Sequence, residues 1–123
     1  MFDNSVKRLN RPQHARGAFS MIMHMVFMKL KPSVAQADID ALFGQFQAMV
    51  GSLDGLESFH GGPYSSPEGI NRGYTHGFSM VFRDAASRDA YLPSDEHMAI
   101  AKGLIDMLDG DFDSTVVAFD YEF

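Results

Sequence analysis

The chain contains no cysteine and no tryptophan among its 123 residues. The lack of cysteine excludes disulfides, thiolate nucleophiles and cysteine-ligated zinc or iron–sulfur sites, and it is compatible with the cytoplasmic location that we expect. Long apolar runs are missing as well. The most apolar stretch, residues 21–30, includes His24 and Lys29 and ends at Lys31 and Pro32. It is shorter than the roughly 18 to 20 apolar residues of a membrane span, so we expect a soluble protein without a membrane segment.

Positive charge is scarce outside the N-terminus. The chain has a net charge of −6, and because residues 1–20 hold four basic residues against Asp3 alone, residues 21–123 are strongly acidic. Neutralisation of phosphates dominates the affinity of proteins for nucleic acids. An acidic domain without a basic stripe therefore indicates that nucleic acid is not a partner.

Residues 1–20 are predicted to form an N-terminal arm in front of a single domain over residues 21–123. The arm is polar and basic, shows no apolar periodicity and lacks the apolar core of a secretory signal. Two interpretations stay open. The arm either packs on the dimer proposed below, or it precedes a natural start at Met21.

The hydrophobic periodicity predicts the order strand, helix, strand, strand, broken helix, strand. Ser33 is expected to cap the first helix, whereas Asp84 and Ser94 cap the two halves of the second, which Pro93 interrupts. The six elements span residues 21–30, 34–50, 56–61, 74–82, 84–110 and 115–123. This order predicts an α+β fold with a ferredoxin-like βαββαβ subunit, in which two helices cover one face of a four-stranded antiparallel sheet.

The first strand is apolar on both of its faces. Met23, Met25 and Phe27 alternate with residues that are equally apolar. Two helices cover only one face of the sheet, and leaving the other in water would cost roughly 25 cal/mol per Å². We therefore expect a homodimer formed through the open sheet face.

Four segments, residues 21–32, 66–74, 90–93 with His97, and 117–121, resemble the stress-responsive A/B barrel (Dabb) family. The resemblance covers residues 21–123. It implies that two ferredoxin-like subunits pack sheet against sheet to form a dimeric α+β barrel. Plant polyketide cyclases of this family, such as olivetolic acid cyclase, use a tyrosine and a histidine six residues apart for an aldol-type ring closure.

The resemblance implies catalytic roles for Tyr91 and His97, which stand at the tyrosine and histidine positions of the cyclases. It places His24 and His76 at the histidine positions of the strands, where they would bind a ligand. One departure concerns the His-Pro-Ala-His segment that is common before the last helix. Here the segment at 94–97 is Ser-Asp-Glu-His, which changes the charge at the pocket mouth.

Alternation along the strands predicts that His24 and His76 lie under the helices and line one pocket with Tyr91 and His97. Alternatively, both strand histidines are core residues bonded to the backbone or to water. Arg72 lies in an Asn-Arg-Gly segment, which is typical of a turn and could also bind an anion at the pocket mouth. No His-Glu-x-x-His spacing is present, and we predict neither a metal nor a cofactor.

These features predict a homodimeric protein with a small-molecule pocket. It is either a binding protein or an enzyme with cofactor-free, cyclase-like or lyase-like acid/base chemistry on a carbonyl or aromatic compound. The first alternative is a purely structural stress-response dimer in which side chains fill the pocket. The second is a monooxygenase-like enzyme of the wider dimeric-barrel group.

Overall fold

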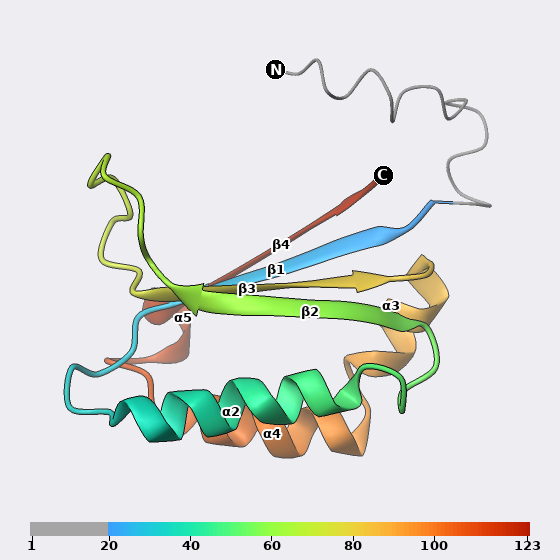
Figure 1. Cartoon of the computed structure of the whole chain (residues 1–123), viewed down its shortest axis with the longest axis horizontal. Helices are drawn as coiled ribbons and strands as arrows, with labels where there is room; N and C mark the ends of the chain where they lie inside the picture. The colour runs from blue at the N-terminus through green and yellow to red at the C-terminus, as the bar shows by residue number, and fades with distance from the viewer. Residues whose placement is uncertain (1–19) are drawn as a thin grey trace.

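The structure is a computed structural model that describes residues 20–123. The predicted arm lies outside these residues except for Ser20, so its packing on a dimer stays a prediction. The chain forms one four-stranded antiparallel sheet in the order β2-β3-β1-β4, and the helices lie along one side of it (Figure 1). The elements are β1 (Ile22–Met28), α2 (Gln36–Met49), β2 (Leu56–Pro63), β3 (His76–Phe82), α3 (Ala85–Tyr91), α4 (Asp95–Asp106), α5 (Phe112–Thr115) and β4 (Val116–Glu122).

The predicted α+β, βαββαβ subunit is confirmed, with three local differences. The helix expected from Ser33 begins at Gln36, and its N-cap residue, Ala35, has no side-chain oxygen to cap it. The third strand begins at His76 because Tyr74 belongs to the preceding turn, where its amide donates to the carbonyl of Asn71. The short helix α5 was not predicted from the sequence.

The break in the second helical region is confirmed. The Asp84 carboxylate accepts from the amide of Ser87, and the Ser94 hydroxyl accepts from the amide of His97. Each cap satisfies an amide that the first turn of its helix leaves unpaired. Tyr91, at the end of α3, and His97, in the first turn of α4, are thereby held close to each other.

Side chains alternate between the two faces of the sheet. The helix-facing positions of β1 are buried against β3 and against apolar side chains of α2 such as Leu42 and Phe46. The opposite face carries apolar side chains that no helix covers, and Phe27 and Phe119 on it are exposed. None of the helices within the described part of the chain has the length and apolar character needed to cross a membrane.

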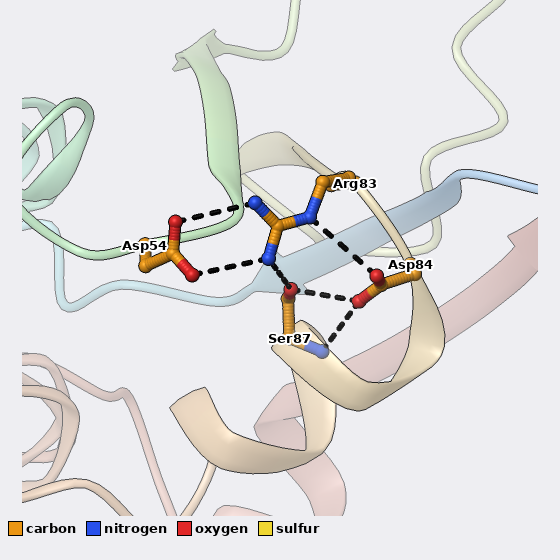
Figure 2. A network of polar contacts seen from close by, with 4 residues as sticks. All are labelled: Asp54, Arg83, Asp84 and Ser87. Carbon is orange, nitrogen blue, oxygen red and sulfur yellow. Dashed lines mark hydrogen bonds and ion pairs between the residues drawn. The ribbon is translucent and has the colours of Figure 1, made fainter.

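A polar network joins the turn before β2 to the start of α3 (Figure 2). Arg83 donates two hydrogen bonds to the carboxylate of Asp54, at 3.2 and 3.1 Å, and one to the Ser87 hydroxyl at 3.3 Å. Gly55 lies beside this network with a φ of 88°, and a Cβ added to it would come within 2.1 Å of the Ser87 Oγ. The position therefore requires glycine for both its backbone conformation and its space.

Gly55→Ala is expected to lower the free energy of unfolding by roughly 1–3 kcal/mol, because the new methyl group meets Ser87 in a strained backbone conformation. Gly44→Ala is the matched control. Gly44 lies within α2, and an added Cβ there would have nothing within 4 Å. It should stabilise the protein by about 0.5–1 kcal/mol. Urea unfolding of both variants tests the difference, and equal stabilities would contradict it.

Candidate active site

His24 is the buried histidine of β1, and it is paired with an acid on the neighbouring strand. The register places His24 opposite Asp120 on β4, and its Nδ1 lies 2.7 Å from the Asp120 Oδ1. A carboxylate can only accept, so Nδ1 carries a proton. The Nε2 atom is then the ring nitrogen that is left for a further partner.

Arg88 of α3 holds the same carboxylate from the helical layer. Its Nη1 donates to the second oxygen of Asp120 at 2.9 Å, and its Nε donates to Asp89 at 2.8 Å. Three elements, β1, β4 and α3, thus contribute one chain of charge-assisted hydrogen bonds from Arg88 through Asp120 to His24. Such bonds fix the orientation and the tautomer of the imidazole.

Tyr91 brings a phenol to the same region. Its side chain is 1% exposed, and among residues 20–123 no atom forms a hydrogen bond with its hydroxyl. Burial raises the pKa of Tyr91 well above its ordinary value, so the hydroxyl stays protonated and is available as a donor. A buried polar group without a partner costs about 1–3 kcal/mol, so this hydroxyl lacks the hydrogen bond that would offset its burial.

His97 lies against Tyr91, with 4.5 Å between their ring centroids. Its Nδ1 is 2.7 Å from the carbonyl oxygen of Leu92. Since a carbonyl can only accept, Nδ1 donates and Nε2 keeps its lone pair in the neutral ring. Burial, the largest effect, lowers the pKa of His97, the hydrogen bond to the Leu92 carbonyl raises it, and the electrostatic effect of the nearby His24 lowers it. The neutral imidazole, which can act as a base, is therefore favoured near neutral pH.

Aromatic rings surround these groups. The His24 ring lies edge-on to the rings of Phe78, Phe82 and Tyr91, with centroid distances of 6.4, 6.2 and 6.2 Å. Tyr91 in turn contacts Phe82 at 5.1 Å. One phenol and two imidazoles are thus gathered in an apolar setting, where electrostatic interactions are stronger than in water.

The expectation that four side chains line one pocket is wrong, because the hollow that His76 lines does not include His24, Tyr91 or His97. His76 pairs with Met28, whereas His24 pairs with Met80, so the two histidines lie four residues apart along the strands, about 13 Å. His76 instead lines a hollow of about 720 Å³, to which His24, Tyr91 and His97 do not contribute. Both histidines lie on the helix-facing side of the sheet, as predicted. The alternation of side chains determines the face that a residue occupies, but it does not determine how far along the strands two residues lie from each other.

Arg72 occupies the predicted turn. Its φ is 54° and that of Gly73 is 89°, and the Tyr74 amide donates to the Asn71 carbonyl at 3.0 Å. Positive φ at both central residues identifies a turn of type I′. Asn71 and Tyr74 line the hollow, and Arg72 does not. The turn interpretation is therefore confirmed, and anion binding by Arg72 has no support from the lining of the hollow.

Residues 22–123 match the sequence model of the family described as Stress responsive A/B Barrel Domain. The chain belongs to this family. The Dabb domain is 25% identical, over 101 residues, to the stress-response A/B barrel domain-containing protein HS1 of Arabidopsis thaliana, a match that covers 82% of this chain and 88% of that protein.

Solved structures show the same architecture. A dimeric ferredoxin-like protein of unknown function from Jannaschia sp. CCS1 has 25% identity and a TM-score of 0.76, over 84% of this chain and 99% of that chain. The hydroxynitrile lyase of Passiflora edulis has 19% identity and a TM-score of 0.72, over 84% and 93% of the two chains, and this likeness concerns the fold alone. The predicted family and fold class are confirmed.

Sequence reasoning missed two residues of the site in this Dabb domain, Asp120 and Arg88. Asp120 carried a signal, since it is an acid at an inward position of the alternating last strand. Its pairing with His24 depends on the strand register, which the sequence did not provide. Arg88 is one of several charged residues on a short helix, and nothing in its spacing distinguished it.

The described part of the Dabb domain, residues 20–123, contains no group of three or more histidine, aspartate or glutamate side chains that could hold a metal ion. His24, Asp120 and Arg88 are tied to one another, and His97 is bonded to Leu92. The chemistry that these side chains can themselves supply is hydrogen-bond donation by Tyr91 and proton transfer by the two imidazoles.

Proposed function

We propose that this Dabb domain is a homodimeric protein that binds a small carbonyl compound and carries out cofactor-free acid/base chemistry on it. The observation that carries the proposal is the buried, unpartnered Tyr91 hydroxyl in ring contact with a neutral His97. The hydroxyl is a donor for a carbonyl oxygen, and the imidazole is a base for a proton on the adjacent carbon.

The reaction is proton abstraction next to the carbonyl. The Nε2 of His97 takes the proton, the C–H electron pair forms the enolate double bond, and the carbonyl oxygen takes up the displaced electron pair. Tyr91 donates its hydrogen bond to that oxygen and stabilises the developing charge. His24, held by Asp120, orients the ligand from the sheet side through its free Nε2.

The homodimer follows from the open sheet face. Phe27, Val117, Phe119 and Tyr121 are exposed on that face. A dimeric relative of similar fold, from Jannaschia, supports the same assembly. Sedimentation at micromolar concentration should give a dimer, with an interface that buries more than about 1,000 Å² in total. Sedimentation as a monomer alone would contradict the proposal.

Proton exchange with solvent gives a direct assay, because it requires no knowledge of the physiological substrate or of its reaction product. The enzyme is incubated in D₂O with acetone, cyclohexanone or acetophenone, and ¹H NMR follows the loss of the protons next to the carbonyl. Wild-type protein should accelerate deuterium uptake above the rate in buffer for at least one ketone. Absence of acceleration for all three would contradict proton abstraction.

The exchange rate should depend on pH through His97. Because burial lowers the pKa of His97, its imidazole loses its proton at a lower pH than an ordinary histidine does. The rate should rise with pH, with its midpoint below about pH 6.5, and then stay level. The raised pKa of Tyr91 keeps the donor protonated past about pH 10. A midpoint above the ordinary histidine value would contradict the assignment of His97 as the base.

A purely structural role is the second candidate, and one observation favours it. Phe46, Phe59 and Phe78 stack between sheet and helices with ring centroids 4.8 to 5.5 Å apart, and they fill much of that layer. Under this alternative, Tyr91 only packs. Tyr91→Phe then raises stability by removing the unpaired hydroxyl and has no effect on ketone binding.

A further inference from the structure

Carboxylates surround the candidate active site. Three segments contribute its side chains, residues 20–26, 84–101 and 116–123. These segments contain a single lysine or arginine, Arg88, against six acids. The acids are Asp84, Asp89, Asp95, Glu96, Asp120 and Glu122. The formal charge of the protein around the site is therefore strongly negative.

Arg88 does not offset this charge for a bound anion, because it is already bonded to two carboxylates. Its Nη1 donates to Asp120 at 2.9 Å, and its Nε donates to Asp89 at 2.8 Å. The cation that directly precedes these segments, Arg83, is paired with Asp54. A carboxylate, sulfonate or phosphate group on a ligand would therefore have to compete with the chain's own acids.

The site is acidic at both places where it comes near the surface. His97 is only partly buried, and the exposed Asp95 and Glu96 directly precede it at the start of α4. On the edge strand β4, the Asp120 side chain is 23% exposed, and Glu122 occupies the next helix-facing position. A ligand that approaches from either place meets carboxylates first.

The N-terminus of α4 does not supply a compensating positive charge. The positive end of a helix dipole attracts anions. The first turn of α4 already contains Asp95 and Glu96, whose charges oppose that of the dipole. Lys102 is the only lysine or arginine of α4, and Asp106 lies one turn further along the helix.

We propose that the site selects carbonyl compounds that carry a cationic or a neutral group beside the ketone and rejects anionic ones, such as keto acids. This inference rests on the proton abstraction proposed above and names its substrate class. The Tyr91 hydroxyl, which is buried and has no hydrogen-bond partner among residues 20–123, positions the carbonyl oxygen. A substituted ammonium group beside the ketone then lies among carboxylates, whereas an anionic group in its place meets like charges.

Three ketones of the same shape isolate the effect of charge. They share the formula CH₃COCH₂X, in which X is tert-butyl, trimethylammonio or sulfonate, so that X is tetrahedral in each and is neutral, cationic or anionic. ¹H NMR follows deuterium uptake from D₂O at low ionic strength. Each rate is divided by the rate of the same ketone in buffer, because X also changes the acidity of the adjacent protons.

The protein should accelerate exchange of the trimethylammonio ketone most and that of the sulfonate least. Several charges at roughly 8 Å, each worth a factor of about two in water, predict a difference of about fivefold or more between these two. The tert-butyl ketone should lie between them. Sodium chloride at about 0.5 M should reduce the difference, because salt screens exposed charges.

The double variant Asp95→Asn, Glu96→Gln tests whether the acids beside His97 cause the preference. It should slow exchange of the cationic ketone and speed that of the anionic one. The matched control is the double variant Asp38→Asn, Asp40→Asn, which removes the same charge from α2. This helix begins at the end of the sheet away from α3 (Figure 1), so the control should keep the wild-type ratio.

The possible results separate this inference from the proposed function. Equal acceleration of the three ketones, or faster exchange of the sulfonate, overturns the charge preference and leaves proton abstraction standing. The same holds if acetone exchanges and none of the three does. A ratio that the control changes as much as the Asp95→Asn, Glu96→Gln variant overturns the local origin of the preference. No acceleration for these ketones or for acetone overturns both the inference and the proposed function.

Discussion

His97→Ala is expected to reduce ketone proton exchange by about 10² to 10⁴, the usual loss on removal of a general base. The reason is geometric: the Leu92 carbonyl holds Nδ1 of His97, which leaves Nε2 as the base beside Tyr91. Tyr91→Phe should lower the rate by a smaller factor, because the base remains and only the hydrogen bond to the enolate oxygen is lost.

The matched control for this loss is His60→Ala. His60 lies on the opposite face of the sheet, beside the hollow. Its replacement by alanine should therefore leave the exchange rate unchanged. Circular dichroism is used to check that each variant is folded. Equal loss of activity in His60→Ala and His97→Ala would contradict the placement of the reaction on the helix-facing side.

Asp120→Ala is expected to lower the free energy of unfolding by about 2–4 kcal/mol. The substitution removes two charge-assisted hydrogen bonds at once and leaves His24 and Arg88 without their shared carboxylate. Removal of one partner of a fully buried ion pair would destabilise a protein more than this. The loss is smaller here because the Asp120 side chain is partly exposed. Chemical denaturation measures the loss.

Asp89→Ala is the matched control, because Asp89 also accepts a hydrogen bond from Arg88 but is exposed. An exposed ion pair contributes about 0–1 kcal/mol. Similar stabilities of the two variants would contradict the view that Arg88, Asp120 and His24 act together. Asp120→Asn should fall between them, since its amide oxygen can still accept one bond.

The sequence predicted which face each strand residue occupies, because side chains alternate strictly along a strand. His24 was placed correctly under the helices on this basis, and the open face with Met25 and Phe27 was recognised. The helix break was also predictable, since Pro93 and the capping residues act locally.

The sequence did not predict what depends on register and tertiary packing. His76 shares the face of His24 but lies at the other end of the strand, a distance that alternation does not define. The pair of His24 with Asp120 joins residues 96 positions apart in the chain.

In the proposed reaction, the Tyr91 hydroxyl donates a hydrogen bond to the carbonyl oxygen of a bound ketone. The infrared stretch of a ¹³C-labelled carbonyl measures this bond directly, because hydrogen bonding lowers its frequency. For acetone, cyclohexanone or acetophenone bound to the wild-type protein, we expect a lower frequency than for the same ketone bound to Tyr91→Phe. Identical frequencies in the two proteins, or no binding of any of the three ketones, would contradict it.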